Sequence, residues 1–525
     1  MNNVYRGWIT CQRNILCRKW HQLVLTSQKY SFSTQTKPGD EGEEEITKPV
    51  LTATLDPEVD KLFNEGLPFY EHPGKRKLIT VNLPSYLELA AKRAISRHLT
   101  QKFREDAFKM NRRMYHLDLP EETEDLIQRK RDITEKVIAN EPPVELSTLN
   151  DDEIQFIKRK REKKINSLLN VTRPSWKEIT YNEYDSHVYL GSRLGANYST
   201  IKYVMNEIRL ANPLFKPKTL FDFGSGHGTT MFAVNDVWPN SVSEHFNVDI
   251  SPSMNELATF LLRGGKESNP MIYNGVYFRE YLPLSSQVKY DLVVSAFTLM
   301  ELPSRAARVH AIESLWQKTH DMLVIIESGT KSSFSVINEV RSLILDMTGH
   351  DVTNTYYEDT DETGVKEYDW KDAPTSHIVA PCPHHMTCPR MFTGGPLLCC
   401  FHVNYHPLDI GQQRKEIQEE RFCYIVLRKG TSDMKKPLWP RINQTVIKNS
   451  GHIICRACCP DGGQKSITLT KAKHKGNMYN CAKSSKWGDL LPANVIETEK
   501  GLSFWEKVKR QRKMERQENR EDDDD

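Results

Sequence analysis

The ten residues Phe221–Thr230, "FDFGSGHGTT", follow an apolar run, "TLFDFG" (219–224), and lead into a segment typical of a helix, "TTMFAVNDVW". Glycines allow a tight turn and let a ligand approach the backbone, and the first turn of a helix presents free N–H groups. Structural turns also collect glycine, but a strand before the turn and a helix after it are the context that a nucleotide-binding turn needs. The stretch therefore predicts a cofactor-binding turn.

Two carboxylates indicate which cofactor this turn would bind. Asp249 ends the next expected strand, where a carboxylate can accept hydrogen bonds from both ribose hydroxyls. Asp222 stands before the first glycine, and a pyrophosphate-contacting G-x-x-G is missing, which favours S-adenosylmethionine over NAD. The expected pocket consists of Asp222, Gly224, Gly226, Gly228 and Asp249, with Tyr189 and Arg193 of the preceding segment "YLGSR" closing over it.

The surrounding sequence alternates between short apolar runs and amphipathic segments. "HFNVDIS" (245–251), "YDLVVSAF" (290–297) and "DMLVIIESG" (321–329) are typical of buried strands, and helical segments such as "SMNELATFLLRGG" separate them. Strands that alternate with helices form right-handed βαβ units and a parallel sheet covered on both faces. We therefore expect an α/β protein with a class I, Rossmann-like S-adenosylmethionine methyltransferase fold.

A methyltransferase fold does not by itself imply methyl transfer. The stretch "SAFTLMELPS" (295–304) lacks the Asn/Asp-Pro-Pro-aromatic wall that base-amino methyltransferases often carry, and it lacks the nucleophilic cysteine of RNA cytosine C5 enzymes. Ser295 and Glu301 are placed to contact a ligand, but neither is an evident catalytic base. The sequence predicts a cofactor turn and no catalytic residue.

Length and charge distribution divide the 525 residues into several regions. A net charge of +3 does not indicate a nucleic-acid binder, and no window approaches the roughly 18 apolar residues that cross a bilayer, so we expect a soluble protein. Residues 1–39 contain Arg, Lys, Ser and Thr but no Asp or Glu, as mitochondrial transit peptides do. The run "KRKREKK" (Lys158–Lys164) on an expected helix is a candidate phosphate-binding patch, although such runs are commonly solvated faces.

The expected regions are a mitochondrial transit peptide at 1–36, an acidic linker at 37–80, a charged helical region at 81–175, the methyltransferase-like domain at 176–349, an acidic insertion at 350–379, a cysteine-rich region at 380–498 and a disordered charged tail at 499–525.

Nine of the eleven cysteines follow residue 381, and none lies between residues 18 and 381. Clustering in a large reduced-compartment protein indicates a metal site or reactive thiols rather than disulfides. Only one short C-x2-C pair, Cys455 with Cys458, is present, whereas a zinc ribbon needs two. Thiols spread through Pro- and Gly-rich loops are compatible with an iron–sulfur cluster. Packing as small apolar side chains is the alternative, and we expect it for Cys423 within "RFCYIVLRKG".

Six motifs together resemble the mitochondrial methyltransferase-like protein 17 group: "FDFGSGHGT", "YDLVVSAFTLMELPS", "LVIIESGT", "APCPHHMTCP", "CPDGG" and "WGDLLP". The resemblance covers roughly residues 80–495. It implies a matrix protein that carries a [4Fe–4S] cluster and acts in assembly of the small mitochondrial ribosomal subunit. The family pattern assigns the cluster ligands to Cys382, Cys388, Cys399 and Cys458. The neighbouring Cys400, Cys455 and Cys459 leave the last two assignments open by a residue or so.

The resemblance predicts an assembly factor that binds the small subunit, mainly its rRNA, through the basic helical region and the cluster region, and that supports mitochondrial translation. The alternative is an active rRNA methyltransferase that uses S-adenosylmethionine. We further expect loss of one cluster ligand to unfold the cysteine-rich region and to leave the methyltransferase-like fold intact.

Overall fold

A computed structural model describes residues 50–141, 150–171, 176–283, 287–350, 375–391, 398–411, 416–432 and 438–498. The expected transit peptide and charged tail lie outside the described residues, as do the first part of the expected linker and most of the expected acidic insertion.

The centre of the protein is an eight-stranded sheet with the order β4-β3-β2-β5-β6-β9-β7, in which β8 also pairs with β9. The first five strands are parallel, β9 is antiparallel to β6, and β7 and β8 are antiparallel to β9. Their bounds are β2 (Thr219–Phe223), β3 (Glu244–Val248), β4 (Val276–Arg279), β5 (Tyr290–Ala296), β6 (Thr319–Ser328), β7 (Ser376–Ala380), β8 (Phe401–Tyr405) and β9 (Gln418–Lys429).

This strand order is that of class I methyltransferases, which confirms the expected fold. The order reverses between β2 and β5, because β3 and β4 continue on one side of β2 and the later strands on the other. Ligands of open α/β sheets bind at such a reversal, outside the carboxyl ends of the strands. The glycine turn follows β2 at that point.

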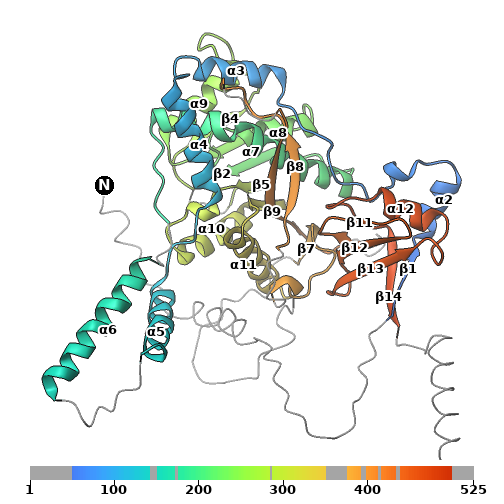
Figure 1. Ribbon diagram of the computed structural model, residues 1–525. Helices are drawn as coiled ribbons and strands as arrows, with labels where there is room; N and C mark the ends of the chain where they lie inside the picture. The colour runs from blue at the N-terminus through green and yellow to red at the C-terminus, as the bar shows by residue number, and fades with distance from the viewer. Residues whose placement is uncertain are drawn as a thin grey trace, which may run out of the picture.

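Alternate residues of the strands pack on opposite faces of the sheet. In β6, Met322, Val324 and Ile326 join a core on one face, while Leu323 and Ile325 join a core on the other. The first core is covered by α3 (Ser85–Ile95), α4 (Gln101–Tyr115), α7 (Glu183–Ala211), α8 (Thr229–Val237) and α9 (Pro252–Leu262), and the second by α10 (Arg305–Lys318) and α11 (Lys331–Met347) (Figure 1).

The sheet continues beyond residue 349, where the sequence predicts the end of the methyltransferase-like domain. Strands β7, β8 and β9 fall within the ranges expected to be an insertion and a cysteine-rich region. Cys423 lies in β9 with no exposed surface, as expected of a core residue. The cysteine-bearing loops therefore interleave with strands of the central sheet instead of forming a separate module.

A smaller β unit follows the sheet in sequence. It combines β10 (Arg441–Ile442), β11 (Ile447–Lys448), β12 (His452–Cys458) and β13 (Gln464–Thr470) with α12 (Asn477–Ser484) and the antiparallel pair of β1 (Val50–Leu55) and β14 (Ala493–Thr498). Its core also receives Val59 and Phe63 of α2 (Pro57–Asn64), which pack with Cys481. Residues 50–64, expected to be a linker, are thus a strand and a helix of this unit.

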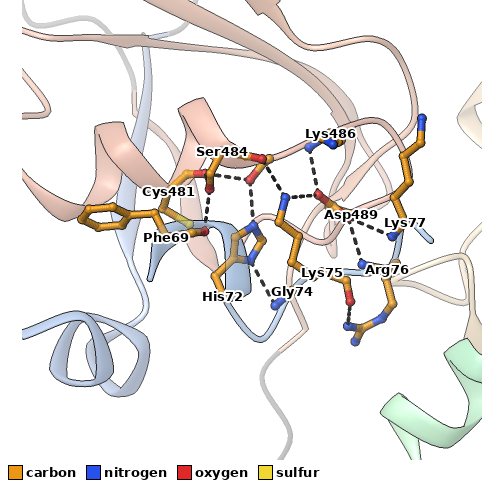
Figure 2. Close-up of polar contacts among 12 residues, drawn as sticks. Phe69, His72, Gly74, Lys75, Arg76, Lys77, Cys481, Ser484, Lys486 and Asp489 are labelled. Carbon is orange, nitrogen blue, oxygen red and sulfur yellow. Dashed lines mark hydrogen bonds and ion pairs between the residues drawn. The ribbon is translucent and has the colours of Figure 1, made fainter. Parts of the chain in front are cut away.

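The segment after α2 is fastened to the same unit by buried polar contacts (Figure 2). The Asp489 carboxylate has no exposed side-chain surface and accepts hydrogen bonds from the backbone N–H groups of Arg76 (2.9 Å) and Lys486 (2.8 Å). It also forms a 2.9 Å ion pair with Lys75, whose ammonium donates to the Ser484 carbonyl as well. These contacts join residues 69–77 to the turn after α12.

The charged helical region contains a separate hairpin of α5 (Thr123–Ala139) and α6 (Asp151–Val171), which lie side by side away from the sheet (Figure 1). Its small apolar contact consists of Ile133 and Val137 from α5 with Ile165 and the partly buried Leu169 from α6. Apart from the partly buried Arg161, the basic residues of Lys158–Lys164 are exposed. None of the described helices is long and apolar enough to cross a bilayer.

Candidate functional site

The glycine turn folds against the end of β3. The backbone N–H groups of Gly224 and Ser225 donate to the Val248 carbonyl at 2.8 and 3.0 Å. Gly224, Gly226 and Gly228 have φ values of +71°, +49° and +71°, a region that side chains other than glycine rarely adopt. A Cβ on Gly224 would lie 2.1 Å from the Thr298 hydroxyl oxygen, whereas one on Gly226 would meet no atom within 4 Å. Gly226 therefore faces open space at the sheet edge.

The Asp249 carboxylate lies beside this turn. Its two oxygens accept hydrogen bonds from the backbone N–H groups of Gly226 (2.8 Å) and Ser251 (2.9 Å). Burial raises its pKa and the two N–H donors oppose that effect. The structure thus brings the expected ribose-binding carboxylate to the turn that contains the glycines. Asp249 also supports the turn itself.

Asp222 occupies a different environment, with only 1% of its surface exposed. Among the residues that the structure describes, neither of its carboxylate oxygens has a partner with full hydrogen-bond geometry, although the Thr230 side chain is close enough to affect its pKa. Burial raises the Asp222 pKa to about 7, although nearby Thr230 lowers it and Asp249 raises it further. A carboxylate held this way in a buried turn costs stability, which is typical of a position kept for a ligand or a turn geometry.

Tyr189 and Arg193, expected to close over the cofactor, lie on the buried face of α7. The Tyr189 hydroxyl accepts a hydrogen bond from Asn197 (2.9 Å), and its ring centroid lies 5.3 Å from that of His227 in the glycine turn. Arg193 forms a buried 2.8 Å ion pair with Glu420 of β9. Tyr189 thus borders the turn, while Arg193 connects α7 to the antiparallel strand.

Beside Glu301, which the sequence places to contact a ligand, three further residues complete the carboxyl edge: Tyr181, Phe297 and Glu327. Glu327, at the end of β6, accepts a hydrogen bond from the Leu299 N–H (2.8 Å), and Tyr181 donates to Glu301 (3.0 Å). Burial raises the pKa values of Glu301 and Glu327 to about 8. Phe297, just after β5, has a φ of +60°. The position of Glu327 at the end of an expected strand was a sequence signal that could have marked it as a pocket residue. The strained backbone of Phe297 and the contact of Tyr181 with Glu301 leave no such signal.

The cysteine loops pack against the face of the sheet that carries α10 and α11. Cys388 belongs to that core, and Cys382 and Cys399 are partly buried against it. Cys458 ends β12, where its Sγ lies 3.2 Å from Nε2 of His384. Arg441, opposite Cys458 in the register of β10 and β12, donates to the carbonyl of Pro381 at 3.1 Å. Segments that are distant in sequence are thereby brought to one place.

The four expected ligands also interact electrostatically. Burial raises the pKa of Cys399 well above its usual value, and the thiols of Cys382, Cys388 and Cys458 raise it further. Burial, followed by Cys382 and Cys388, likewise raises the pKa of Cys458.

The three alternative ligands have other neighbours. Burial raises the pKa of each, and the other groups that act on them are charged side chains: Arg421, Arg390 and Glu419 for Cys400, Lys448 for Cys455, and Asp461 and Lys465 for Cys459. Cys459 nevertheless acts on the Cys458 thiol, and Cys423 acts on that of Cys399, so these interactions group the four expected ligands without separating them from their neighbours.

Among the residues that the structure describes, no group of three or more His, Cys, Asp or Glu side chains has the geometry to hold a metal ion. The donor chemistry suits an iron–sulfur cluster nonetheless, because four thiols, two of them buried and two partly buried, act on one another electrostatically. A zinc ion draws its sulfurs to about 2.3 Å, whereas a four-iron cluster is larger and holds its thiolates farther apart. The set therefore fits a cluster by composition.

Comparison with known proteins decides the family. The family model described as "Mitochondrial small ribosomal subunit Rsm22" matches residues 183–492, a range that includes the glycine turn and all four cysteines. The chain belongs to the Rsm22 family. It is 34% identical over 430 residues to the human "Ribosome assembly protein METTL17, mitochondrial", covering 82% of this chain and 87% of the human protein. It is 21% identical to "Ribosome assembly protein RSM22, mitochondrial" of Saccharomyces cerevisiae, covering 62% of this chain and 69% of the yeast protein.

Solved structures similar to this Rsm22-family chain include the magnesium protoporphyrin IX methyltransferase ChlM from Synechocystis PCC 6803 with bound SAM. The sequences of this chain and ChlM are 12% identical, the match covers 48% of this chain and 86% of ChlM, and the TM-score is 0.24. Because that score is low, the fold assignment of this Rsm22-family member rests on its own strand order.

Proposed function

We propose that the chain is an assembly factor of the mitochondrial small ribosomal subunit that acts in the matrix by binding the subunit's rRNA. The observation that carries this proposal is the family match over residues 183–492, together with the human relative named as a ribosome assembly protein. The hairpin of α5 and α6 supports the rRNA contact, since it projects from the sheet and exposes basic side chains. Such side chains bind phosphates in a salt-dependent manner.

The hairpin contact is tested by replacing three exposed lysines of α6 and measuring binding to small-subunit rRNA at several salt concentrations. The variant carries Lys160→Gln, Lys163→Gln and Lys164→Gln. We expect weaker binding and a shallower salt dependence, reduced by about 0.7–0.9 per lost phosphate contact. The matched control removes three exposed lysines near the opposite, amino-terminal edge of the sheet, through Lys216→Gln, Lys218→Gln and Lys289→Gln. Equal loss in both variants would exclude a specific role for α6.

S-adenosylmethionine is the cofactor that we propose for the glycine turn. Gly226 faces open space, and Asp249 is close enough to hold the backbone of the turn and to offer carboxylate oxygens to a ribose. Tyr189 would border the ligand, with Arg193 as a support behind it. Calorimetry should detect binding by the intact protein and none by Gly226→Val, because the branched side chain would fill the open space. If Gly226→Val retains binding, the ligand lies elsewhere.

The alternative of an active rRNA methyltransferase makes a separate prediction about the same variant. If the function needs only S-adenosylmethionine bound in the site, Gly226→Val changes subunit assembly without removing a defined rRNA methyl group. If turnover is the function, one methyl group disappears while the protein still joins the particle. Mass spectrometry of the small-subunit rRNA distinguishes the two.

We propose a [4Fe–4S] cluster held by Cys382, Cys388, Cys399 and Cys458. The mutual electrostatic influence of these thiols supports this set, and Cys459, which also acts on Cys458, is the alternative fourth ligand. When bound, the cluster would provide four metal–sulfur bonds between the loops, and the chain's own residues would supply the thiolates and exclude water.

Anaerobic purification followed by iron and sulfide analysis and a visible spectrum tests the cluster. Cys388→Ser and Cys458→Ser should lose the brown absorbance, while Cys400→Ser and Cys455→Ser should keep it. Loss in Cys400→Ser and retention in a Cys399→Ser variant would transfer the third ligand to Cys400. Zinc in place of iron under anaerobic conditions would contradict the cluster.

A further inference from the structure

Arg341 of α11 is a buried cation close to the cysteine loops. Only 2% of its surface is exposed. Its Nη2 donates to the carbonyls of His384 and Met386, in the loop between Cys382 and Cys388. Its Nε and Nη1 have no hydrogen-bond partner among the residues that the structure describes. The guanidinium therefore has donors left over inside the protein.

The other deeply buried arginines each have a carboxylate partner, which Arg341 lacks among the described residues. Arg193 lies 2.8 Å from Glu420, Arg308 lies 3.2 Å from Glu339, and Arg441 contacts Glu207. A buried charge without a counter-charge costs several kcal/mol, which explains why such residues are paired. Within the described part of the chain, no carboxylate is recorded in an ion pair with Arg341. The anion that balances Arg341 has to come from a different kind of group.

The Arg341 charge acts on the thiols of Cys388 and Cys458 and on the imidazoles of His384 and His385. Burial raises the pKa of Cys388 to about 11 and Cys382 adds to that effect, whereas Arg341 lowers it. The pKa of Cys458 is raised by burial and by the neighbouring thiols, and Arg341 again lowers it. The Arg341 charge is therefore close enough to two of the expected ligands to act on them electrostatically. Four thiolates around a cationic iron–sulfur core carry a net negative charge, which grows by one when the core accepts an electron.

We propose that Arg341 is the counter-charge of the cluster site, and this inference rests on the cluster proposed above. The guanidinium holds the ligand loop through the carbonyls of His384 and Met386 and turns its remaining charge and N–H groups towards the anionic cluster. His384 lies on the same side, with Nε2 3.2 Å from the Cys458 sulfur.

Net charge and hydrogen bonds to the sulfurs are among the factors that set an iron–sulfur reduction potential. A nearby cation stabilises the reduced, more negative state more than the oxidised state. Removing the Arg341 charge should therefore make reduction of the cluster harder and move its midpoint potential to more negative values. Replacing Arg341 with lysine keeps the charge and loses the two-carbonyl clamp, so the potential should move less.

The experiment uses full-length protein purified anaerobically as wild type, Arg341→Gln, Arg341→Lys and Lys331→Gln. Lys331 is exposed on the same helix and controls for the loss of one charge far from the cluster. Iron and sulfide content is measured first, and the midpoint is then found by titration with dithionite, a one-electron reductant of the cluster, followed by visible absorbance and electron paramagnetic resonance.

We expect wild-type iron and sulfide in Arg341→Lys and Lys331→Gln, and a more negative midpoint in Arg341→Gln than in either. If Arg341→Gln fails to hold iron while Arg341→Lys holds it, the requirement for the charge is equally supported. Arg341→Gln with normal iron and an unchanged midpoint overturns this inference and leaves the cluster itself intact. Failure of both Arg341 variants assigns the residue to loop packing alone and also overturns it. Wild-type protein without iron and sulfide refutes the cluster and this inference together.

Discussion

Replacing Asp222 with asparagine should stabilise the protein at neutral and alkaline pH. Asp222 is buried near the end of β2, its oxygens have no partner with full hydrogen-bond geometry in the described part of the chain, and burial raises its pKa from 3.8 to about 7. A carboxyl whose pKa is higher in the folded state favours folding fully only below its unfolded pKa, and this contribution is lost as the pH rises towards 7. Asparagine has a similar shape and does not ionise, so it avoids that loss.

The size of the effect follows from the two pKa values. The difference between 3.8 and about 7 is roughly 3 pKa units, each worth about 1.36 kcal/mol. The cost to the wild type is about 2 kcal/mol at pH 5 and about 4 kcal/mol at pH 8. The advantage of Asp222→Asn should therefore grow by roughly 2–3 kcal/mol over this range, equivalent to several degrees in the unfolding midpoint.

Thermal unfolding of the wild type and Asp222→Asn at pH 5, 6.5 and 8 measures this difference. Asp489→Asn is the matched control, because Asp489 is equally buried but accepts backbone N–H groups and pairs with Lys75 (Figure 2). Burial raises the Asp489 pKa, but Lys75 and the N–H donors outweigh burial, so the net pKa is lowered. Asp489→Asn should destabilise the protein above pH 4. An Asp222→Asn advantage that does not change with pH would refute the reasoning.

Two further substitutions test the turn and the buried ion pair. Gly224→Ala should destabilise the fold by about 1–3 kcal/mol and weaken S-adenosylmethionine binding in calorimetry, because φ is +71° and the new Cβ would lie 2.1 Å from the Thr298 hydroxyl. Gly226→Ala is the control and should cost less, because its Cβ has open space. Equal losses of stability in the two variants would contradict this account. Glu420→Gln should destabilise the protein by about 3–5 kcal/mol in denaturant unfolding, since Arg193 keeps a buried charge without its carboxylate. Combining Arg193→Met with Glu420→Leu should recover much of that stability. No recovery in the double variant would show that the pair matters chiefly for packing.

The parallel strands could be predicted from sequence because each is an apolar run between a turn and a helix. The expected runs at 219–224, 245–251, 290–297 and 321–329 correspond to β2, β3, β5 and β6. The short β4 was missed, since its four residues alternate between partly buried and exposed positions. The place of β9 was also missed. "FCYIVLRKG" was recognisable as a strand, but nothing local shows that it lies antiparallel to β6.

The residues of the candidate site, like the strands, could be predicted where the contacts are local in sequence and not where they depend on the packing of distant segments. The glycines and Asp249 are close in sequence to the turn that they form, so their joint role could be predicted. Glu420 reaches Arg193 from 227 residues away, and this pairing depends on the position of β9. Arg341 gave no signal in the sequence, since an arginine on an amphipathic helix is ordinarily solvated. Its proposed role rests on burial without a carboxylate partner among the described residues, which only the packed structure reveals.

The arrangement of α11 changes what loss of the cluster should do. The helix begins directly after β6, whose last residues include Glu327 at the cofactor edge, and its Arg341 contacts the loop between Cys382 and Cys388. The cysteine loops pack on the core that α11 shares with β6 and β9. The sequence alone predicts that the methyltransferase-like fold survives intact while the cysteine region unfolds. That outcome requires the two regions to have separate cores. Because these elements share a core, losing a ligand should also disturb the carboxyl edge, and cluster occupancy should alter the affinity for S-adenosylmethionine.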